Sequence, residues 1–563
     1  MKKLLVFSVF TLLFSIASAQ QNCDITLEKP IRLLTTELER GMPVFKKLDP
    51  PVYYLSYTYS EEEKGYITVR NGGVASRWEG RNNLLKVQAR VGNTQMDNTR
   101  LLKNDYSDYS AVRTWVPLSR KGGKGFSTVL WWATEEAIIA AQRKYDKVKS
   151  DQKISSERGD DSDDFVIPPT EKYCHTESFP SFDTDKIQQL LLKASEEIRG
   201  QKEVLDSDFS FSKEEGHRYF VDSNGTQLKT PFQFVRLGYV LENKTKEGYG
   251  FQLYKSYDVT RMEELPTEEQ LLADVRQTID LLKQLTTAPD AEPITVPAIL
   301  KNKAMGVFVH EVLGHRLEGH RQKEDSFGKT FTTKIGQQIL PSFLTLVADP
   351  TVKTFQGKPM RGYYEFDDEG VKARPVVLVE NGVLKNFLMS SSPIKGFPVS
   401  NGHGRSDSSH RSVARMSHLV LTSSKTVSYE ELERQLIEEV KKQGKPYGII
   451  IEDLSGGYTF TETFLPQTFK LHVVEMYRVY PDGRKELVRG GEIAGTPLVS
   501  FNEILVTADD YGIFNGSCGA ESGWVPQSEV APSVLLRNME VELTAKETDR
   551  LPILKSPYAE GAK

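Results

Sequence analysis

Long hydrophobic runs are nearly absent from this sequence of 563 residues, and positive charge is not in excess. Beyond the N-terminus, no stretch approaches the ~20 apolar residues that a transmembrane helix needs. The formal net charge is −5 and the isoelectric point is about 6.1. A protein that binds nucleic acid carries a basic surface for the phosphate backbone, so this composition argues against a nucleic-acid partner. No internal repeat is evident.

The one long apolar run lies at the N-terminus and has the form of a signal peptide. Two lysines precede an apolar segment from Leu4 to Ile16, and the small residues Ala17-Ser18-Ala19 form a cleavage site. The segment is too short for a conventional membrane anchor, and Cys23 does not directly follow a lipoprotein cleavage site. We therefore expect residues 1–19 to be removed. The mature protein is expected to be exported, periplasmic or extracellular, without a membrane anchor.

Histidine is also scarce, yet three of the nine histidines fall within eleven residues. The segment reads His310-Glu311-Val312-Leu313-Gly314-His315 and continues to His320. Imidazole nitrogens are good ligands for a divalent metal ion, and a glutamate beside the first ligand can act as a base toward a metal-bound water. The segment therefore indicates a candidate zinc site.

The spacing of this motif differs from that of the common zinc-protease motif HExxH. In HExxH the two histidines lie roughly 40° apart around an ideal helix, whereas the i, i+5 spacing of His310 and His315 places them roughly 140° apart. Two ligands of one ion then require either a local π-bulge or a helix that ends near Gly314. The alternative is a pair of histidines on an amphipathic helix with solvated glutamates, so the motif alone leaves both interpretations open.

Further motifs accompany this segment in the C-terminal half. They are YYEFDDEGVKARPVVLVENGVLKNFL at 363–388, NGHGRS at 401–406, the Arg415-Met416 pair and NGSCGAESGWVPQSEVAPSVLLRNMEVE at 515–542. Together with HEVLGHRLEGH at 310–320, they resemble the TldD/PmbA family of metallopeptidases, long described as modulators of DNA gyrase. The resemblance covers much of residues 300–545 and is to the catalytic, TldD-like branch, with this chain as an exported member.

The resemblance implies a ligand set and a reaction. In the catalytic branch the zinc ligands are the two motif histidines and a C-terminal cysteine, which implies His310, His315 and Cys518 here. It implies Zn²⁺ as the cofactor, with Glu311 activating a zinc-bound water for attack on a peptide bond. The implied substrates are short or unfolded peptides. The implied assembly is a homodimer or a heterodimer with a PmbA-like chain.

Other polar residues compete for roles at this site. His320 is close in sequence but does not match a ligand position of the family, and His403 and His410 are expected to line the substrate cleft or to bond backbone carbonyls. Glu318 is either an exposed helix carboxylate, which we favour, or a partner that orients a ligand imidazole. The acidic turn Asp367-Asp368-Glu369 is expected to be solvated.

Three cysteines leave one unpaired after any disulfide. If Cys518 is a zinc ligand, Cys23 and Cys174 remain as a disulfide pair. Both could instead be free, and this interpretation is slightly favoured because Cys23 lies close to the new N-terminus. Cys518 itself is expected in a loop whose flanking Gly516 and Gly519 let the backbone approach the metal.

Composition and periodicity predict an α+β fold with two large domains. Apolar residues make up 38% of the chain and aromatic residues 10%, enough for real hydrophobic cores. Turn residues predict hairpins at Asn71-Gly72-Gly73 and at Asn381-Gly382 between Val376–Glu380 and Val383–Leu388. The patterns also predict helices at 26–48, 134–150, 184–197 and 267–287, and C-terminal strands at 448–453, 468–480, 487–489 and 499–506.

The resemblance adds an expected architecture to these elements. Residues 20–296 are expected to form an N-terminal α/β domain, in which the polar run 149–164 is a mobile insertion. Residues 297–545 are expected to form the catalytic domain, a β-rich, curved antiparallel and barrel-like unit that carries the HExxxH helix. Residues 546–563 are expected to be a C-terminal tail.

Two other functions stay open at this point. An exported subunit with a vestigial HExxxH motif could bind or assemble with an extended peptide by strand addition without cleaving it. A zinc amidohydrolase could use the same residues on a non-peptide amide. Zinc content separates the first alternative from a peptidase, and the identity of the cleavage products separates the second.

Overall fold

The computed structural model describes residues 21–100, 102, 111–117, 124–152, 160–245, 250–323, 327–461, 463, 465 and 468–544. The predicted signal peptide and C-terminal tail lie outside the described residues, as does the centre of the predicted insertion. Within the described part of the chain, no helix is long and apolar enough to cross a membrane.

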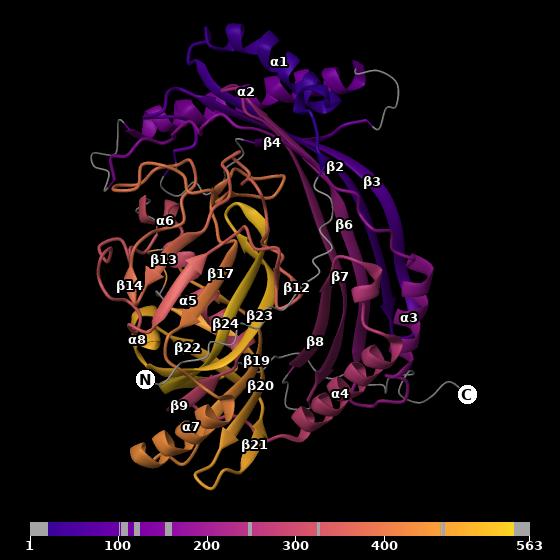
Figure 1. Ribbon diagram of the computed structural model, residues 1–563, viewed down its shortest axis with the longest axis vertical. Helices are drawn as coiled ribbons and strands as arrows, with labels where there is room; N and C mark the ends of the chain where they lie inside the picture. The colour runs from indigo at the N-terminus through magenta and orange to yellow at the C-terminus, as the bar shows by residue number, and fades with distance from the viewer. Residues whose placement is uncertain are drawn as a thin grey trace, which may run out of the picture.

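The N-terminal part is a long curved sheet that helices cover on one face (Figure 1). The sheet has eight strands in the order β1-β5-β7-β6-β2-β3-β4, with β8 paired to β7. Neighbouring strands are antiparallel except for the parallel pair β5–β7. The strands are β1 (Gln21–Asn22), β2 (Val52–Arg70), β3 (Gly73–Val91), β4 (Ala111–Trp115), β5 (Lys172–Thr176), β6 (Asp206–Asp222), β7 (Gln227–Lys244) and β8 (Gly250–Val259).

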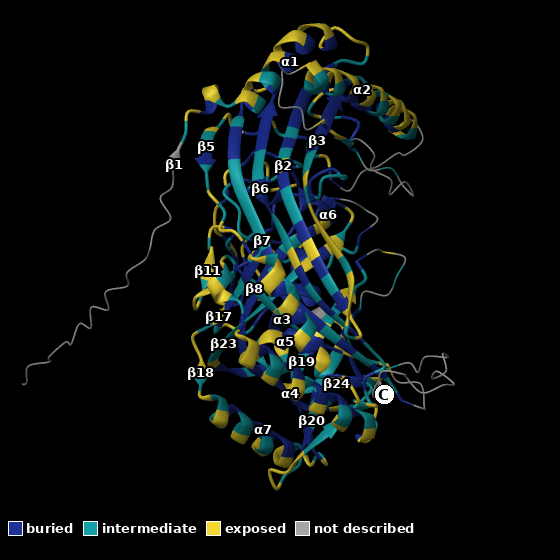
Figure 2. Cartoon of the chain, turned by 90° about the vertical axis from the view of Figure 1, so that its right-hand side faces the viewer, coloured by how far each residue is buried: buried dark blue, intermediate teal, exposed yellow. Residues whose placement is uncertain are grey.

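Four long helices pack on the outer face of this sheet: α1 (Lys29–Phe45), α2 (Lys124–Gln152), α3 (Thr184–Glu196) and α4 (Glu268–Thr287). Their apolar stripes enter two core clusters, α1 and α2 over one half of the sheet and α3 and α4 over the other. Figure 2 shows buried strand segments beneath α1 and α2, whereas the outward helix surfaces are exposed. The predicted helices are confirmed, but α2 begins ten residues earlier than predicted.

The hairpin prediction at Asn71-Gly72 is also confirmed. Asn71 and Gly72 both have positive φ angles, 47° and 81°, as the turn between two twisted strands requires. The predicted mobile insertion is ordered at both ends, however. Residues 149–152 continue α2, and Asp160 and Asp164 are buried. Asp164 accepts hydrogen bonds from the backbone N–H of Asp97 at 3.0 Å and from Arg100 at 2.8 Å. Backbone and guanidinium donors therefore hold part of a segment whose composition suggested mobility.

The C-terminal part is built on a closed five-strand barrel, which confirms the predicted barrel-like fold. β9 (Ile294–Leu300), β19 (Gly448–Thr459), β20 (Phe469–Val479), β22 (Gly491–Gly495) and β24 (Gly523–Leu543) follow one another, and the pairing of β24 with β9 closes the ring. β23 (Ile504–Ala520) extends the sheet as a hairpin with β24. Further strands continue from the barrel: β10 (Leu344–Ala348), β13 (Val376–Glu380), β14 (Val383–Leu384), β17 (His418–Ser423), β18 (Thr426–Val427) and β21 (Lys485–Val488).

The described C-terminal part also contains the helices α5 (Asn302–Val312), α6 (His320–Lys323), α7 (Tyr429–Gln443) and α8 (Pro497–Asn502). Two short strand pairs complete it: β11 (Thr354–Phe355) with β12 (Lys358–Pro359), and β15 (Gly404–Arg405) with β16 (Val413–Ala414). The hairpin at Asn381-Gly382 is confirmed, although its second strand ends at Leu384. The predicted strand at 499–506 is wrong over its first half, because α8 occupies that segment. Proline at the first helical position starts this short helix.

Helix α5 lies in the protein interior along nearly its whole length, and every residue from Ala304 to Val312 is buried. It packs against β19, β23 and β24. Gly306 permits the closest approach, since a Cβ atom there would lie 3.0 Å from Cβ of Glu529 on β24. The helix that carries the histidine motif is therefore an element of the barrel core, and the positions of its side chains are fixed by packing.

Cys23 and Cys174 form a disulfide, so the interpretation that both are free is wrong. Cys23 follows β1, which pairs with β5, the strand that contains Cys174. Pairing of these strands brings the two cysteines together in spite of a sequence separation of 151 residues. Cys518 is the free cysteine, and it is buried.

We expect the double variant Cys23→Ser/Cys174→Ser to lose about 2–4 kcal/mol of unfolding free energy, because the crosslink restrains a long loop of the unfolded chain. Denaturant unfolding of the parent and the variant measures this difference, with reduced parent protein as the control. The same midpoint for oxidised parent and variant would show that the bridge does not stabilise the fold.

The acidic turn at 367–369 is not solvated as predicted. Asp367 and Glu369 are buried, and burial followed by the neighbouring Glu369 charge raises the pKa of Asp367 well above its ordinary value. Asp367 accepts hydrogen bonds from the backbone N–H groups of Val371 and Gly404, each at 2.9 Å. Asp368 pairs with Arg218 of β6. The turn therefore joins the C-terminal part to the N-terminal sheet.

Candidate metal centre

The histidine motif folds as a helix that ends between its two histidines. Helix α5 ends at Val312, and a 3₁₀ turn over Gly314–Leu317 follows and carries His315. A Cβ atom at Gly314 would lie 2.1 Å from Sδ of Met416, so any larger residue in this turn would have to displace the Met416 side chain. The imidazole rings of His310 and His315 lie 5.0 Å apart between centroids, at 86° to each other. Of the two geometries that the spacing allowed, a helix that ends near Gly314 is confirmed and a π-bulge is wrong.

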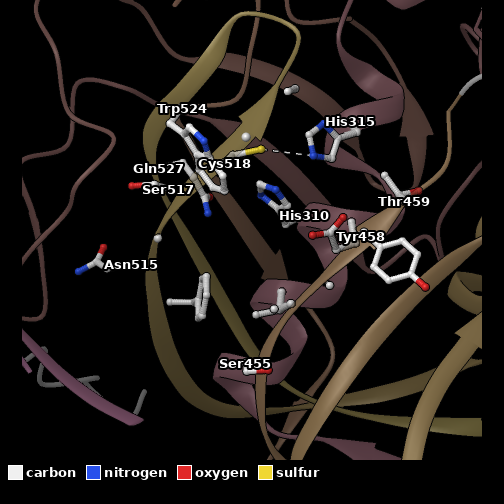
Figure 3. A pocket seen from close by; sticks show the side chains of 18 of the residues that line it. His310, His315, Ser455, Tyr458, Thr459, Asn515, Ser517, Cys518, Trp524 and Gln527 are labelled. Carbon is white, nitrogen blue, oxygen red and sulfur yellow. Dashed lines mark hydrogen bonds between the residues drawn. The ribbon is translucent and has the colours of Figure 1, made fainter. Parts of the chain in front are cut away.

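Cys518 completes a cluster of three candidate ligands. The ligand atoms of His310, His315 and Cys518 all lie within 4.8 Å of one another, and the three residues are buried. Cys518 Sγ lies 3.3 Å from Nε2 of His315 (Figure 3). The expectation of a loop around Cys518 is wrong, because the residue belongs to strand β23 and pairs with Val525 of β24. The hairpin register fixes its position.

Each imidazole is oriented by a buried carboxylate. Nδ1 of His310 donates to Oε1 of Glu529 at 2.8 Å, and Nδ1 of His315 donates to Oε2 of Glu318 at 3.2 Å. These bonds leave Nε2 of each ring available to a metal ion, and a carboxylate behind a ligand imidazole is the usual support at zinc sites. Two imidazole nitrogens and one thiolate are a donor set that suits Zn²⁺ and leave a fourth position open. The residues present fit a zinc ion.

Charge in the site favours the ionised thiol that a metal needs. Burial alone would raise the pKa of Cys518, but His315 and His310 lower that pKa well below the ordinary thiol value. Burial alone would lower the pKa of His315, but the Cys518 thiolate and the Glu318 carboxylate raise it to about 9. A metal ion would therefore meet a thiolate, and it would take the place of the protons on the imidazoles.

Glu311 lies beside the ligands and is free to act as a base. Its side chain is only 7% exposed, yet its carboxylate forms no hydrogen bond or ion pair with any residue that the structure describes. Gly457 of β19 leaves room for it, because a Cβ atom there would lie 3.2 Å from Cγ of Glu311. Glu311 also lines the same cavity as the three ligands.

The cavity at this centre has a volume of about 850 Å³ and lies between the two halves of the molecule. One wall is the curved N-terminal sheet, which contributes residues of β6, β7 and β8 such as Ser210, Arg236 and Tyr254. The opposite wall consists of the ligands, the end of β19 and the β23–β24 hairpin. The side chain of Arg236 reaches across and donates to the backbone carbonyl of Asn515 at 2.9 Å. The site therefore opens into a cleft that both halves of the chain build.

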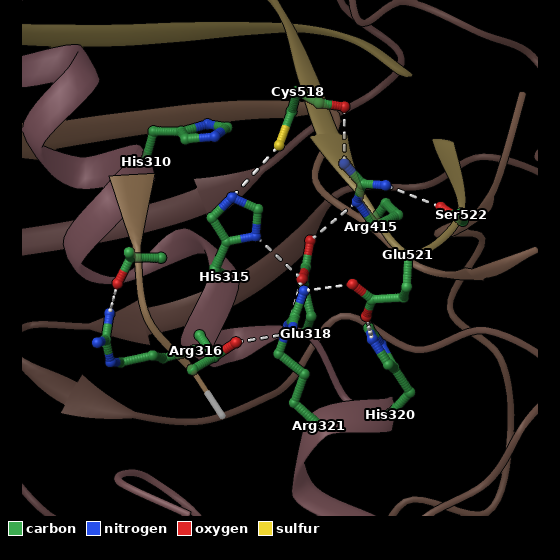
Figure 4. A network of polar contacts seen from close by, with 12 residues as sticks. His310, His315, Arg316, Glu318, His320, Arg321, Arg415, Cys518, Glu521 and Ser522 are labelled. Carbon is green, nitrogen blue, oxygen red and sulfur yellow. Dashed lines mark hydrogen bonds and ion pairs between the residues drawn. The ribbon is translucent and has the colours of Figure 1, made fainter. Parts of the chain in front are cut away.

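Glu318 is not the exposed carboxylate that we favoured from the sequence. It is fully buried and belongs to a network of charged groups (Figure 4). Arg321 donates to its Oε2 at 2.8 Å, and Nε of Arg415 forms an ion pair with its Oε1 at 3.2 Å. Burial would raise the pKa of Glu318, but His315 and Arg321 lower it to about 2. The alternative role, a partner that orients the ligand imidazole of His315, fits this geometry.

Arg415 connects the two sides of the centre. Its side chain has no exposed surface. Besides the ion pair with Glu318, it donates to the backbone carbonyl of Cys518 at 2.8 Å and to Oγ of Ser522 at 2.8 Å. It therefore fixes the strand that carries Cys518 relative to the carboxylate that holds His315. The sequence shows the Arg415-Met416 pair but not this role.

We expect Arg415→Met to lower zinc affinity about 10- to 100-fold, the usual effect of removing a partner behind the ligands. Competition with a chromophoric chelator measures this affinity, and Arg415→Lys serves as a milder variant. Arg90→Met is the matched control, because Arg90 is another buried arginine, bonded to Asp97 and Thr99 in the N-terminal sheet. The control should lose stability and keep zinc affinity. Unchanged zinc affinity in both Arg415 variants would contradict the role.

The other histidines lie outside the ligand cluster. His320 pairs with Glu521, next to the bond from Arg321 to the same carboxylate at 2.8 Å. His403 is buried and contacts Oγ of Ser417 at 3.2 Å, and His410 donates to Asp407 at 2.7 Å. His320, Glu318 and Glu521 are also close enough to hold an ion. Arg321, however, already forms ion pairs with both of these carboxylates. Among the described residues, the centre thus comprises His310, His315 and Cys518.

The fold and the site together define an α+β protein whose C-terminal barrel carries a candidate metal centre of two histidines and one cysteine, next to a cleft. Residues 293–543 match the family profile of the PmbA/TldA metallopeptidase C-terminal domain. The chain therefore carries the C-terminal domain of the PmbA/TldD family.

Relatives in sequence have names that agree with this domain. The chain is 26% identical to a metalloprotease of Methanothermobacter thermautotrophicus over 340 residues, which are 60% of this chain and 70% of the relative. It is 28% identical to a zinc metalloprotease TldD homolog of Saccharolobus solfataricus over 248 residues, 44% of this chain and 51% of the relative. With several such relatives the alignment spans only about half of their length.

Similarity in fold extends over nearly the whole chain. A crystal structure described as a modulator of a DNA gyrase from Thermotoga maritima matches with a TM-score of 0.59 and 16% identity, over 90% of this chain and 100% of that chain. TldE from Thermococcus kodakarensis matches with a TM-score of 0.59 and 16% identity, over 90% of this chain and 99% of that chain. At this identity the similarity establishes the fold alone.

Proposed function

We propose that this protein is a zinc-dependent metallopeptidase that hydrolyses short or unfolded peptides. The observation that carries the proposal is the convergence of His310, His315 and Cys518 on one point. Carboxylates orient both imidazoles, and the carboxylate of Glu311, which has no partner among the described residues, lies beside the cluster in the cleft. The names of the relatives, metalloprotease and zinc metalloprotease TldD homolog, support the same reaction.

Each residue of the centre has a separate role in the proposed hydrolysis. His310, His315 and Cys518 would hold the zinc ion, which supplies a Lewis acid that polarises the scissile carbonyl and makes water more acidic. Glu311 accepts a proton from the attacking water and returns it to the leaving amine nitrogen. Glu529 and Glu318 keep the imidazole rings in one orientation throughout.

The size of the cleft supports extended peptides as the substrate class. A volume of about 850 Å³ between two sheets has room for a few residues of a peptide chain and excludes a folded domain. We also propose that the protein acts outside the cytoplasm after removal of residues 1–19. The Cys23–Cys174 disulfide supports an oxidising compartment. The proposed assembly is a homodimer or a heterodimer with a PmbA-like chain, and the fold similarity to TldE supports such a relative.

Two measurements on the mature protein test the proposal. Elemental analysis should find about one zinc per chain. Incubation with a library of unstructured peptides, followed by mass spectrometry, should find products that a chelator abolishes and zinc restores. Stoichiometric zinc without any peptide product would favour an amidohydrolase for other amides. Absence of a transition metal, with no activity restored by zinc, would leave only a binding subunit.

A further inference from the structure

A buried amide without a partner lies on the wall of the cleft. Gln527 of β24 is 2% exposed, and its Oε1 has no hydrogen-bond partner among the residues that the structure describes. Its side chain as a whole forms no hydrogen bond to any residue in the described part of the chain, yet it lines the cavity that contains the metal ligands. Buried polar side chains nearly always have a partner, so an unpaired one needs an explanation.

The register of the β23–β24 hairpin directs this amide toward the metal centre. Gln527 lies opposite Gly516, between the pair that contains Cys518 and the pair that contains Glu529. Residues opposite each other in an antiparallel pair, and those two positions further along, point to the same face of the sheet. Cys518 and Glu529 both contact the ligand histidines from this face, Glu529 through its hydrogen bond with His310. Gln527 therefore points to the side of the hairpin that builds the centre.

Gly516 provides the space that the amide occupies. A Cβ atom at residue 516 would lie 2.9 Å from Nε2 of Gln527, so any side chain there would displace the amide. In Figure 3, Gln527 lies beside Cys518 on the wall of the cavity. A residue placed here only for packing would be apolar, like the neighbouring buried Val525. The amide is instead kept unpaired where a ligand can reach it.

We propose that Gln527 is a second catalytic residue, whose amide hydrogen-bonds to the peptide bond of the substrate at the metal centre. The proposal rests on the peptidase function. Nε2–H donates to the carbonyl oxygen of the scissile bond and stabilises the negative charge that develops on that oxygen during attack, while Oε1, which is unpaired in the free protein, accepts from a backbone N–H of the same peptide. A donor held in a water-poor site stabilises such charge strongly, because it needs no reorganisation at the moment of reaction. The amide is unpaired in the free protein because its hydrogen-bond partner is the bound substrate.

The variant Gln527→Met tests this role, since methionine has a similar length and offers neither a strong donor nor a strong acceptor. Its kcat on β-casein, an unfolded protein, should fall about 100-fold and its KM should rise about tenfold, with little change in zinc content. Its melting temperature should equal or exceed that of the parent, because the variant no longer buries an unpaired amide. A merely structural glutamine would give the opposite result, a lower melting temperature with turnover retained in the folded fraction.

Gln88 provides a matched control, as a second buried amide with an unpaired atom: its Nε2 has no partner in the described part of the chain. It lies on β3 and does not line the cleft. Gln88→Met should also keep or raise the melting temperature, but it should leave kcat unchanged. Parent-like kcat in Gln527→Met, or loss of activity that only follows loss of stability, would overturn the proposal.

A binding measurement separates this proposal from the peptidase function. β-Casein is titrated into the zinc-loaded Glu311→Gln variant with and without Gln527→Met. At least tenfold weaker binding after the second substitution supports Gln527 as a substrate contact, even if the parent cleaves nothing and the peptidase function fails. Equal binding by the two proteins, or no binding by either, overturns the role of Gln527.

Discussion

Replacement of Glu311 by glutamine is expected to lower peptide hydrolysis by about 10²- to 10⁴-fold, the range that general acid–base catalysis contributes. Glutamine has the same size but cannot accept a proton from water. The three ligands are untouched, so zinc content should stay near that of the parent. The measurements are kcat on β-casein and zinc content by elemental analysis of the same preparation.

The surroundings of Glu311 explain why this loss should be large. Its carboxylate has no hydrogen bond or ion pair with the described residues, so its lone pairs are available to water in the cleft. Glu529, another carboxylate on the hairpin, already accepts the hydrogen bond from His310. Glu318 is held by Arg321 and by His315. Neither can take over as base without releasing a ligand imidazole.

Glu439→Gln is the matched control for this experiment, because it makes the same chemical change on helix α7. Glu439 is also buried, but it bonds Lys442 and does not line the cleft. Its turnover should equal that of the parent. Near-normal turnover in Glu311→Gln would mean that another group activates the water, and Glu521 at the edge of the cleft would be the next candidate.

Local patterns of the sequence were sufficient for much of the fold. Asn71-Gly72 and Asn381-Gly382 specify tight turns through their positive φ angles, and both hairpins were predicted from these pairs. The periodicity of α3 and α4 located these helices nearly to the residue. The segment at 499–506 failed because its apolar residues fit a strand as well as the short helix α8, and tertiary packing decides between them.

The candidate site could be predicted only in part, and the division has a physical reason. His310, Glu311 and His315 are close in sequence, so their chemistry is visible in a short motif. Only the family resemblance links Cys518 to this motif, because Cys518 and His315 are separated by 203 positions in sequence and come into contact only when the barrel folds.

Groups that support the ligands were missed or misjudged. Burial is a tertiary property, so Glu318 looked like an exposed helix carboxylate although it is fully enclosed. Glu529 and Gln527 lie inside a motif that the sequence displays, but their roles depend on the register of β24 against β23. The sequence does contain one signal for these roles, which is the alternation of side chains along a strand. If Cys518 binds the metal, Gly516 lies on the same face of the sheet. The residues paired with Cys518 and Gly516 on β24 then also face the metal centre.

Replacement of Cys518 by serine is expected to remove most of the zinc affinity and to abolish hydrolysis. A serine hydroxyl is a far weaker ligand than a thiolate, since it stays protonated near neutral pH and is a harder donor. The site favours the anionic form of this thiol, because the two imidazoles lower its pKa well below the ordinary value. The variant should fold normally, because serine is no larger than cysteine and the hairpin hydrogen bonds are formed by the backbone.

Zinc affinity of Cys518→Ser is measured by chelator competition, next to melting temperature and turnover. If Cys518 were only a small buried thiol, its replacement would alter packing and leave zinc content intact. His320→Ala, His403→Ala and His410→Ala are the comparison set, and all three should retain zinc, because these side chains bond Glu521, Ser417 and Asp407 rather than the ligand cluster. If the serine variant bound zinc as tightly as the parent while one histidine variant did not, that histidine, and not Cys518, would be the third ligand.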